Sequence, residues 1–319
     1  MAFLRKINTR AKTAVNTGFG DNAANYGGRF LNKDGKANIK KTGIGILERY
    51  SWFHSMLAMS GLKFFLVILA FFIVVNFFFA LVYYFLGVEH LGGMIAHNER
   101  EKFLEAFFFS TQTFTTVGYG RISPTGFVTS AIAAFQSLVG LLSFAVATGL
   151  MYARFSKPTA YLKFSQNAII APYKGITALM LRLAPYKNTT LTDAEARLTL
   201  GMMVEENGKV ANRFFPLELE FDKVNALTLN WTLVHPITES SPLFGFIKDD
   251  YKINAGEVIV FIKAFDDMFS NTVVTRSSYT FDEIIYGAAF NPMYHRDETN
   301  AVTQLDLDKL NDYRKVDLA

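Results

Sequence analysis

The sequence predicts a membrane-embedded α-helical part followed by an all-β cytoplasmic domain. Residues 64–87 and 122–153 form two long runs without a charged side chain, and the period of the apolar pattern changes after Phe155. About 20 apolar residues cross a bilayer as a helix, whereas apolar residues at alternate positions in short segments indicate strands. A chain of 319 residues is long enough for about two such domains.

The amino-terminal segment, residues 1–46, is basic and is expected to be cytoplasmic. Residues 1–49 carry ten Lys and Arg but only three acidic side chains. The positive-inside rule places such a segment on the cytoplasmic side of the membrane. Two spans return the chain to the side from which it started. Both termini are therefore expected in the cytoplasm, with the multi-pass protein in the cell (inner) membrane.

Residues 47–60 (LERYSWFHSMLAMS) have apolar side chains at helical spacing, with polar residues between them. An amphipathic helix rich in aromatic residues ahead of a membrane span is typical of a helix lying in the interface plane. The segment is therefore predicted to be an interfacial slide helix. An amino-terminal extension of the first membrane helix is the alternative.

Residues 61–157 are predicted to form the membrane domain. Its outer helix is expected at 62–86, with Lys63 reaching the headgroups at one end and Tyr83 and Tyr84 at the opposite interface. Its inner helix is expected at 126–156. The alternative for either helix is the buried core of a soluble protein.

A shorter apolar segment, FLEAFFFSTQTF, lies between the two spans at residues 103–114. Twelve residues are too few to cross the bilayer, so a re-entrant pore helix is predicted at 102–114. The backbone that follows is tolerated at membrane depth only where it is buried in protein or lines water.

The segment after the pore helix resembles the selectivity filter of potassium channels, in which a TVGYG loop supplies rings of carbonyl oxygens that replace the water shell of the ion. Glycine permits backbone conformations that a side chain forbids, and four copies around an axis close each ring. The Thr116 hydroxyl would supply the innermost ring. The expected filter residues are Thr115, Thr116, Val117, Gly118, Tyr119 and Gly120, with K⁺ bound by Thr116, Val117, Gly118 and Tyr119.

Residues 158–319 are predicted to form a β-sandwich. Pro158 ends the inner helix, and short period-two segments with turn residues between them follow. Strands are expected at 179–183, 198–204, 217–221, 227–234, 258–264 and 272–276. Short helices are expected around 192–196 and 280–286.

Four motifs make the chain similar to one family over most of its length, from about Glu48 to Leu307. They are AFFFSTQTFTTVGYG (106–120), LMYARFSKP (150–158), HPITESSPLFG (235–245) and RSSYTFDEII (276–285). The chain resembles the inward-rectifier potassium channels, in particular the prokaryotic KirBac branch. The resemblance implies a homotetramer with a slide helix, two membrane helices per subunit and an immunoglobulin-like cytoplasmic domain. It also implies passive permeation of K⁺.

The resemblance assigns roles along the inner helix. Ser143 occupies the cavity position at which a carboxylate produces strong rectification, so weak rectification is expected. Tyr152 matches the bulky residue that closes the pore, and Phe144 lines the cavity above it; an interfacial anchor is the alternative for Tyr152. Gly140 and Gly149 are interpreted as gating hinges or as positions of close helix packing. The cytoplasmic acids Asp266 and Asp267 are the alternative source of cation block if Ser143 does not control it, and residues 267–273 are a second candidate constriction.

Basic residues at headgroup level are interpreted as sites for anionic phospholipids, as in the family. They are Arg49, Lys63, Arg154 and Lys157. Ordinary positive-inside charge is the alternative. Gln112 stands where eukaryotic members have a glutamate that pairs with an arginine after the filter. Arg121 therefore lacks that partner, and support for the filter is expected from elsewhere, from Glu105 or from polar hydrogen bonds.

The composition argues against an enzyme. The chain has no cysteine, and its five histidines are isolated, so neither a thiolate metal site nor a Ser/His/Asp arrangement is indicated. His235 is interpreted as a structural residue. No cofactor is expected apart from K⁺ in the filter, and the expected partners are K⁺, three further copies of the chain and membrane lipids, without nucleic acid. Two alternatives remain: a two-span potassium channel gated by an unidentified cytoplasmic ligand, and a membrane-anchored β-sandwich adaptor.

Overall fold

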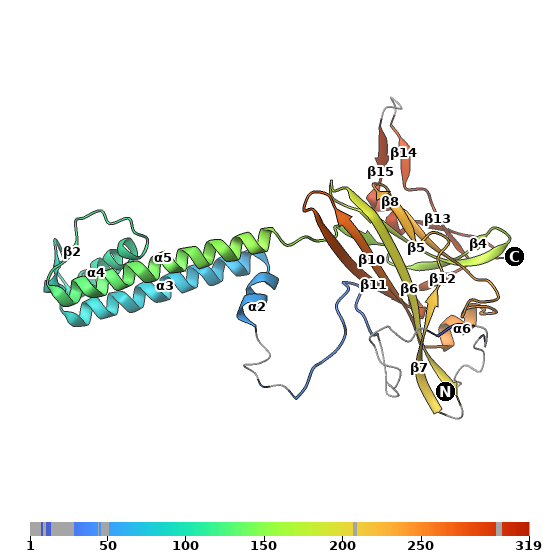
Figure 1. The fold of residues 1–319 in the computed structure, drawn as a ribbon, viewed down its shortest axis with the longest axis horizontal. Coiled ribbons are helices and arrows are strands. Elements are labelled where there is room, and N and C mark those ends of the chain that lie inside the picture. The colour runs from blue at the N-terminus through green and yellow to red at the C-terminus, as the bar shows by residue number, and fades with distance from the viewer. Residues whose placement is uncertain are drawn as a thin grey trace. The chain divides into compact units, whose positions relative to one another are not determined.

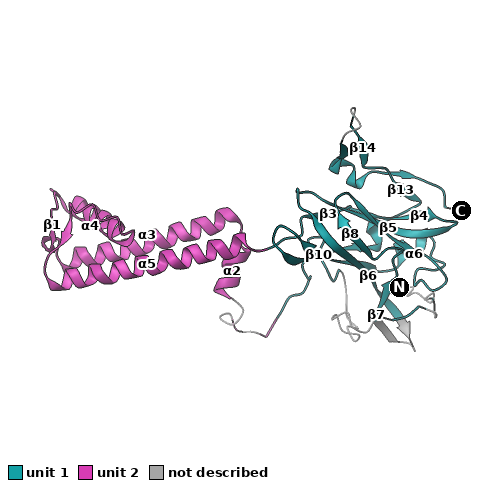
Figure 2. Ribbon diagram, turned by 45° about the horizontal axis from the view of Figure 1, so that its top comes forward, with its two compact units in different colours: residues 1–41, 158–319 teal, residues 42–157 magenta. Residues whose placement is uncertain are grey.

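A computed structural model describes residues 8, 11–13, 29–43, 45, 51–206, 209–297 and 302–318 (Figure 1). The chain divides into two compact units (Figure 2): residues 42–157, which are mainly helical, and residues 1–41 with 158–319, which are mainly strands. Within the described residues, the architecture is the predicted helical membrane part and all-β domain.

Two long helices dominate the first unit. Helix α3 spans Gly61–Leu86 and α5 spans Phe127–Phe155, against predictions of 62–86 and 126–156. Both are long and apolar enough to cross a membrane, and in each only 17% of the most apolar window is buried inside the chain. A core helix of a soluble protein would be mostly buried, so these exposed apolar surfaces are suited to lipid and to neighbouring subunits.

A third helix of this unit, α4, spans Glu99–Phe114 and starts three residues before the predicted pore helix. Asn98 fixes this start, because its side-chain oxygen accepts a hydrogen bond from the Glu101 amide at 2.9 Å. Glu99 and Glu101 lie in the first turn, where the helix dipole favours negative charge. The spacing of apolar residues had located the helix body, whereas the cap lies in the polar stretch before it.

A short helix, α2, covers Trp52–Ala58 within the predicted 47–60 segment, of which residues 47–50 lie outside the described part. Ser51 caps it by accepting from the His54 amide at 3.3 Å. Met59 and Ser60 are extended, so α2 and α3 are separate helices. Residues 59 and 60 do not belong to α2, although the predicted helix included them. The remaining elements of this unit are η1 (Val88–His90), β1 (Leu91–Gly92) and β2 (Ser123–Pro124).

Two five-stranded sheets form the second unit. One sheet has the order β11-β10-β6-β7, with β8 also paired to β6, and the other has the order β12-β4-β5-β3, with β9 also paired to β5. The first sheet consists of β6 (Leu191–Glu206), β7 (Lys209–Leu217), β8 (Lys223–Leu227), β10 (Gly256–Asp266) and β11 (Asn271–Thr280). The second consists of β3 (Leu162–Phe164), β4 (Ala168–Tyr173), β5 (Ile176–Pro185), β9 (Trp231–Pro236) and β12 (Ile284–Tyr286). All strand neighbours are antiparallel except β12 and β4.

The core of this unit lies between the sheets. Leu181 and Leu233 of one sheet and Leu198 and Val260 of the other are fully or almost fully buried in one apolar cluster, as the inner faces of a β-sandwich are. Shorter elements surround it: α6 (Lys248–Ile253), η2 (Phe281–Glu283), β13 (Ala288–Phe290), β14 (Tyr294–Arg296), β15 (Thr303–Leu305), η3 (Leu307–Asn311) and β16 (Tyr313–Lys315).

Three predictions inside the β domain were wrong, and the helix expected around 280–286 was only partly right, because η2 covers Phe281–Glu283 and Ile284–Tyr286 form strand β12. The expected helix at 192–196 is part of strand β6, which pairs with β10 and β8; partner strands override weak local helix propensity. Of the strand expected at 217–221, only Leu217 lies in a strand, as the last residue of β7. The expected strand at 227–234 is two strands, because the chain crosses there from one sheet to the other: β8 pairs with β6 and β9 with β5.

Part of the basic amino-terminal segment packs on the sandwich of its own unit. The amides of Phe30 and Leu31 donate to the buried carboxylate of Glu257. Leu31 also pairs with Ala37 in an isolated antiparallel β-bridge. The Arg29 guanidinium forms an ion pair with Glu283 at 3.0 Å. This segment is thus anchored by charge and backbone hydrogen bonds together.

Candidate functional site

The filter segment begins where α4 ends. The Thr115 amide donates to the Thr111 carbonyl at 3.0 Å, as the last residue of a helix does. The next amides turn back: Val117 N and Gly118 N both point to the Gln112 carbonyl, at 3.0 and 3.4 Å. The helix α4 therefore holds the first four amides of this segment, from Thr115 to Gly118, through its own carbonyls.

Three residues of the filter segment have left-handed backbone. The φ angles are 60° at Thr116, 52° at Gly118 and 84° at Gly120. Glycine adopts this region readily, but a β-branched threonine is an outlier there, at a cost on the order of 1–3 kcal/mol. Within the described chain, a Cβ on Gly118 or Gly120 would meet no atom within 4 Å. Within one chain, the requirement for glycine at these two positions is thus conformational.

All six residues from Thr115 to Gly120 are exposed in the single chain. Val117 is 53% and Tyr119 80% exposed. Exposed backbone is not tolerated at membrane depth unless protein or a water-filled path surrounds it. A single copy of the chain does not supply such surroundings for this segment.

Glu105 of α4 supports the segment after the filter. Its Oε1 forms an ion pair with Arg121 Nη2 at 2.9 Å, and its Oε2 accepts from the Ile95 amide at 3.1 Å. Glu105 was one of the two sources of support predicted for the filter, and the structure pairs it with Arg121. One carboxylate thus joins the loop before α4 to the loop after the filter.

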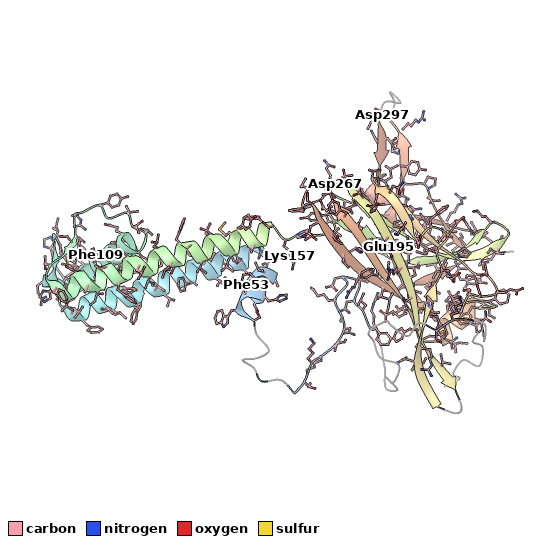
Figure 3. The ribbon with its side chains drawn as sticks, in the orientation of Figure 1. Phe53, Phe109, Lys157, Glu195, Asp267 and Asp297 are labelled. Carbon is pink, nitrogen blue, oxygen red and sulfur yellow. The ribbon has the colours of Figure 1, made fainter. Side chains whose placement is uncertain are left out.

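Four polar side chains between the helices were not predicted as functional. They are Asn76 of α3, Tyr83 of α3, Ser110 of α4 and Gln136 of α5, all at most 1% exposed and hydrogen-bonded to one another. Tyr83 packs against Phe109, which is labelled in Figure 3, with ring centroids 5.1 Å apart. Its prediction as an interfacial residue was therefore wrong. Polar residues inside membrane spans are a signal of function, and Asn76 stands alone in an apolar run.

Gly140 of α5 packs against the end of α4. A Cβ built on Gly140 would lie 2.0 Å from the Phe114 carbonyl oxygen, whereas a Cβ on Gly149 would meet no described atom within 4 Å. Of the two interpretations offered by the sequence, this geometry favours close packing at Gly140. A hinge at Gly149 stays a prediction.

Three inner-helix residues predicted to line the pore lie toward the cytoplasmic half of α5. Phe144 is 73% and Tyr152 75% exposed in the single chain, so both are free to contact other subunits. The Ser143 hydroxyl donates to the Val139 carbonyl of its own helix at 2.7 Å. This back-bonding is the alternative that the sequence left open for Ser143, and it leaves the side chain uncharged and partly exposed.

The predicted lipid-binding cations have different environments. Lys63 and Lys157 are exposed. Arg154 instead ties two helices to α5, because its Nη1 donates to the Met56 carbonyl of α2 at 3.4 Å and its guanidinium lies 5.4 Å from the ring centre of Phe64 on α3. Arg49 lies outside the described residues.

The two acids of the β10–β11 turn differ. Asp266 is fully buried and accepts from the Met268 and Phe269 amides, so its role is to shape the turn. Asp267 is exposed (Figure 3) and contacts the Thr192 hydroxyl at 3.1 Å. Of the two, Asp267 is the one placed to meet a soluble cation.

His235 is a structural residue, as predicted. Its Nδ1 donates to the Glu218 carbonyl at 2.6 Å and its Nε2 accepts from the Ser241 hydroxyl at 2.8 Å, in the tautomer that these partners require. Burial lowers the pKa of His235, and the hydrogen bond to Glu218 only partly opposes this. The imidazole is therefore neutral where it links β9 to the turn that follows.

Two spans, a re-entrant helix that ends at an exposed filter segment and a β-sandwich domain define a channel subunit. Comparison with known proteins agrees. Residues 70–157 match the "Ion channel" family, and residues 162–319 match "Inward rectifier potassium channel C-terminal domain".

The inward rectifier potassium channel Kirbac3.1 of Paramagnetospirillum magnetotacticum is 34% identical over 267 residues, covering 82% of this chain and 88% of that protein. Inward rectifier potassium channel 18 of Homo sapiens and ATP-sensitive inward rectifier potassium channel 12 of Mus musculus are each 30% identical over 201 residues, which cover 60% of this chain and 46% and 47% of their own lengths. The chain spans about half the length of these two relatives.

The chain belongs to the inward rectifier potassium channel family. It is accordingly an integral membrane protein with two spans, located in the inner membrane, in a family of ion channels and not of enzymes.

Proposed function

We propose that four copies of this chain form a potassium-selective channel of the inward-rectifier type. The observation that carries the proposal is the TTVGYG segment, which follows directly on the carboxyl end of α4 and whose first four amides, from Thr115 to Gly118, donate to carbonyls of that helix. Its carbonyls are then free to replace the hydration shell of K⁺. Four exposed filter segments around one axis supply the rings that a single subunit lacks.

The end of α4 adds electrostatic support. The carboxyl end of a helix carries a partial negative charge of about half an elementary charge, and four such ends face a shared cavity in the proposed assembly. A cation there is favoured because the surrounding membrane has a low dielectric constant.

The channel is proposed to rectify weakly and to respond to anionic lipids. Ser143 adds no charge to the cavity, so internal polyamines or Mg²⁺ bind there less tightly than beside a carboxylate. The exposed cations Lys63 and Lys157 each attract an anionic surface by about 1 kcal/mol. Arg49 and Arg154 complete the proposed lipid-responsive set, Arg154 by tying α2 and α3 to the inner helix.

Rubidium uptake into proteoliposomes tests this function. The wild-type protein should conduct K⁺ and Rb⁺ but exclude Na⁺, and Ba²⁺ should block it. Gly118→Ala should abolish flux or selectivity, because alanine disfavours the φ of 52° at this position. Equal Na⁺ and K⁺ flux through the wild-type protein would refute the proposal.

A further inference from the structure

Four polar side chains that are not part of the filter segment lie buried between the membrane helices. Asn76, Ser110 and Gln136 are fully buried, and Tyr83 is 1% exposed. They come from α3, α4 and α5, so every long helix of the unit contributes to the group. We refer to these four residues as the buried polar chain.

Its hydrogen bonds run in one direction. Tyr83 Oη donates to Gln136 Oε1 at 2.7 Å, Gln136 Nε2 donates to Ser110 Oγ at 2.7 Å, and Ser110 Oγ donates to Asn76 Oδ1 at 2.9 Å. Asn76 Nδ2 ends the chain on the Phe72 carbonyl at 2.8 Å. Gln136 Nε2 also donates to the Ser110 carbonyl at 2.9 Å. Each of Gln136, Ser110 and Asn76 accepts a hydrogen bond from one neighbour and donates one onward. Removal of one member therefore leaves buried polar groups of its neighbours unpaired.

The buried polar chain meets the pore helix close to the filter. Gln136 of α5 contacts Ser110 of α4. One turn further along both helices, Gly140 contacts Phe114. The first contact is polar, and the second is a close backbone approach. Between Ser110 and Phe114 lies Gln112, whose carbonyl accepts from the Val117 and Gly118 amides of the filter segment. A shift of Ser110 along the membrane normal thus moves the carbonyl that holds the filter.

We propose that Asn76, Tyr83, Ser110 and Gln136 are positioning residues that set the depth of the pore helix, and hence the spacing of the filter carbonyls. This inference rests on the proposed function, because it assigns these residues an effect on potassium selectivity. Apolar contacts between helices in lipid are weakly directional, since lipid and side chains are equally apolar. Hydrogen bonds with defined partners fix the register of α4 against its two neighbours.

The test compares Gln136→Leu and Ser110→Ala with the wild-type protein in proteoliposomes. The readouts are the ratio of K⁺ to Na⁺ permeability, the concentration of external Ba²⁺ that blocks half of the flux, and the elution of the assembled channel in size-exclusion chromatography. Each substitution should lower the permeability ratio about fivefold, the factor that corresponds to the loss of one net hydrogen bond. The double variant should lose no more than the single variants, because both residues act through one contact.

Ser137→Ala is the matched control. Ser137 neighbours Gln136 on α5, but its hydroxyl donates only to the Ala133 carbonyl of its own helix in the described structure, at 3.0 Å. Its permeability ratio should stay within about twofold of the wild-type value.

The outcomes separate this inference from the proposed function. A wild-type protein that does not select K⁺ would refute the proposed function itself. A selective wild-type protein whose Ser110→Ala and Gln136→Leu variants keep its permeability ratio and Ba²⁺ block would overturn the positioning role. If Gln136→Leu fails to assemble, Ser110→Ala decides the question, because it removes a single oxygen atom.

Discussion

The close approach of Gly140 to the pore helix leads to a sharp prediction for Gly140→Ala. The new Cβ would lie 2.0 Å from the Phe114 carbonyl oxygen and 2.8 Å from its carbon, whereas ordinary contacts begin at 3.4 Å. The two helices must therefore separate by about 1.4 Å at this point. Because the obstacle is backbone at the end of α4, no side-chain rotation relieves the clash.

The energetic cost follows from two opposing effects. Overpacking of this kind costs about 1–3 kcal/mol, and the higher helix propensity of alanine offsets about 1 kcal/mol. A backbone clash belongs at the upper end of the range, so we expect a net destabilisation of about 2 kcal/mol per subunit. Because Phe114 directly precedes the filter segment, the ratio of K⁺ to Na⁺ permeability should fall as well.

Apparent melting temperature in detergent and Rb⁺ and Na⁺ flux in proteoliposomes check this prediction. Gly149→Ala is the control, since its Cβ meets no described atom within 4 Å; it should keep selectivity and gain stability from helix propensity. If Gly140→Ala matched the wild-type protein in both melting temperature and selectivity while altering only open probability, close contact at Gly140 would be refuted in favour of a hinge.

Three further predictions concern rectification, gating and pH. Ser143→Asp should deepen block by internal spermine or Mg²⁺ in voltage-clamped bilayers, and a wild-type protein that already rectifies as steeply would assign block to Asp267. Tyr152→Ala should raise Rb⁺ flux without changing selectivity, because an apolar constriction gates by dewetting; unchanged flux would move the gate to residues 267–273 or to the filter. Burial lowers the pKa of His235 from 6.5, so as the pH falls the unfolded chain binds the proton at a higher pH than the folded chain does. The stability contributed by neutral His235 is present above about pH 6.5 and is lost as the pH falls through the folded-state pKa. Melting temperatures from pH 8 to pH 5 should fall less steeply for His235→Gln, and parallel profiles would contradict this.

Much of the architecture could be predicted because it depends on local patterns. A charge-free run of 20 or more residues has few structures open to it, since unpaired backbone groups are costly in lipid. The helices α3 and α5 therefore begin and end within one residue of their predicted bounds. The start of α4 was missed by three residues, because the Asn98 cap is a single polar side chain among other polar residues. In the β domain, the helix predicted at 192–196 failed because pairing with β8 and β10 outweighs local propensity.

The sequence by itself determined the two spans, the shorter helix between them, the TTVGYG segment that is proposed as the filter, and the β class of the remaining chain. Only the tertiary structure decided which polar residues meet: Asn76, Ser110 and Gln136 are separated by 34 and 26 positions, and Glu105 reaches Arg121 across the filter. It also decided that Gly140 lies against Phe114. The physical reason is that spans follow from the free energy of transferring each residue from water into the membrane, and turns follow from local backbone preference. Contacts between helices depend on how whole faces pack, which no local period encodes.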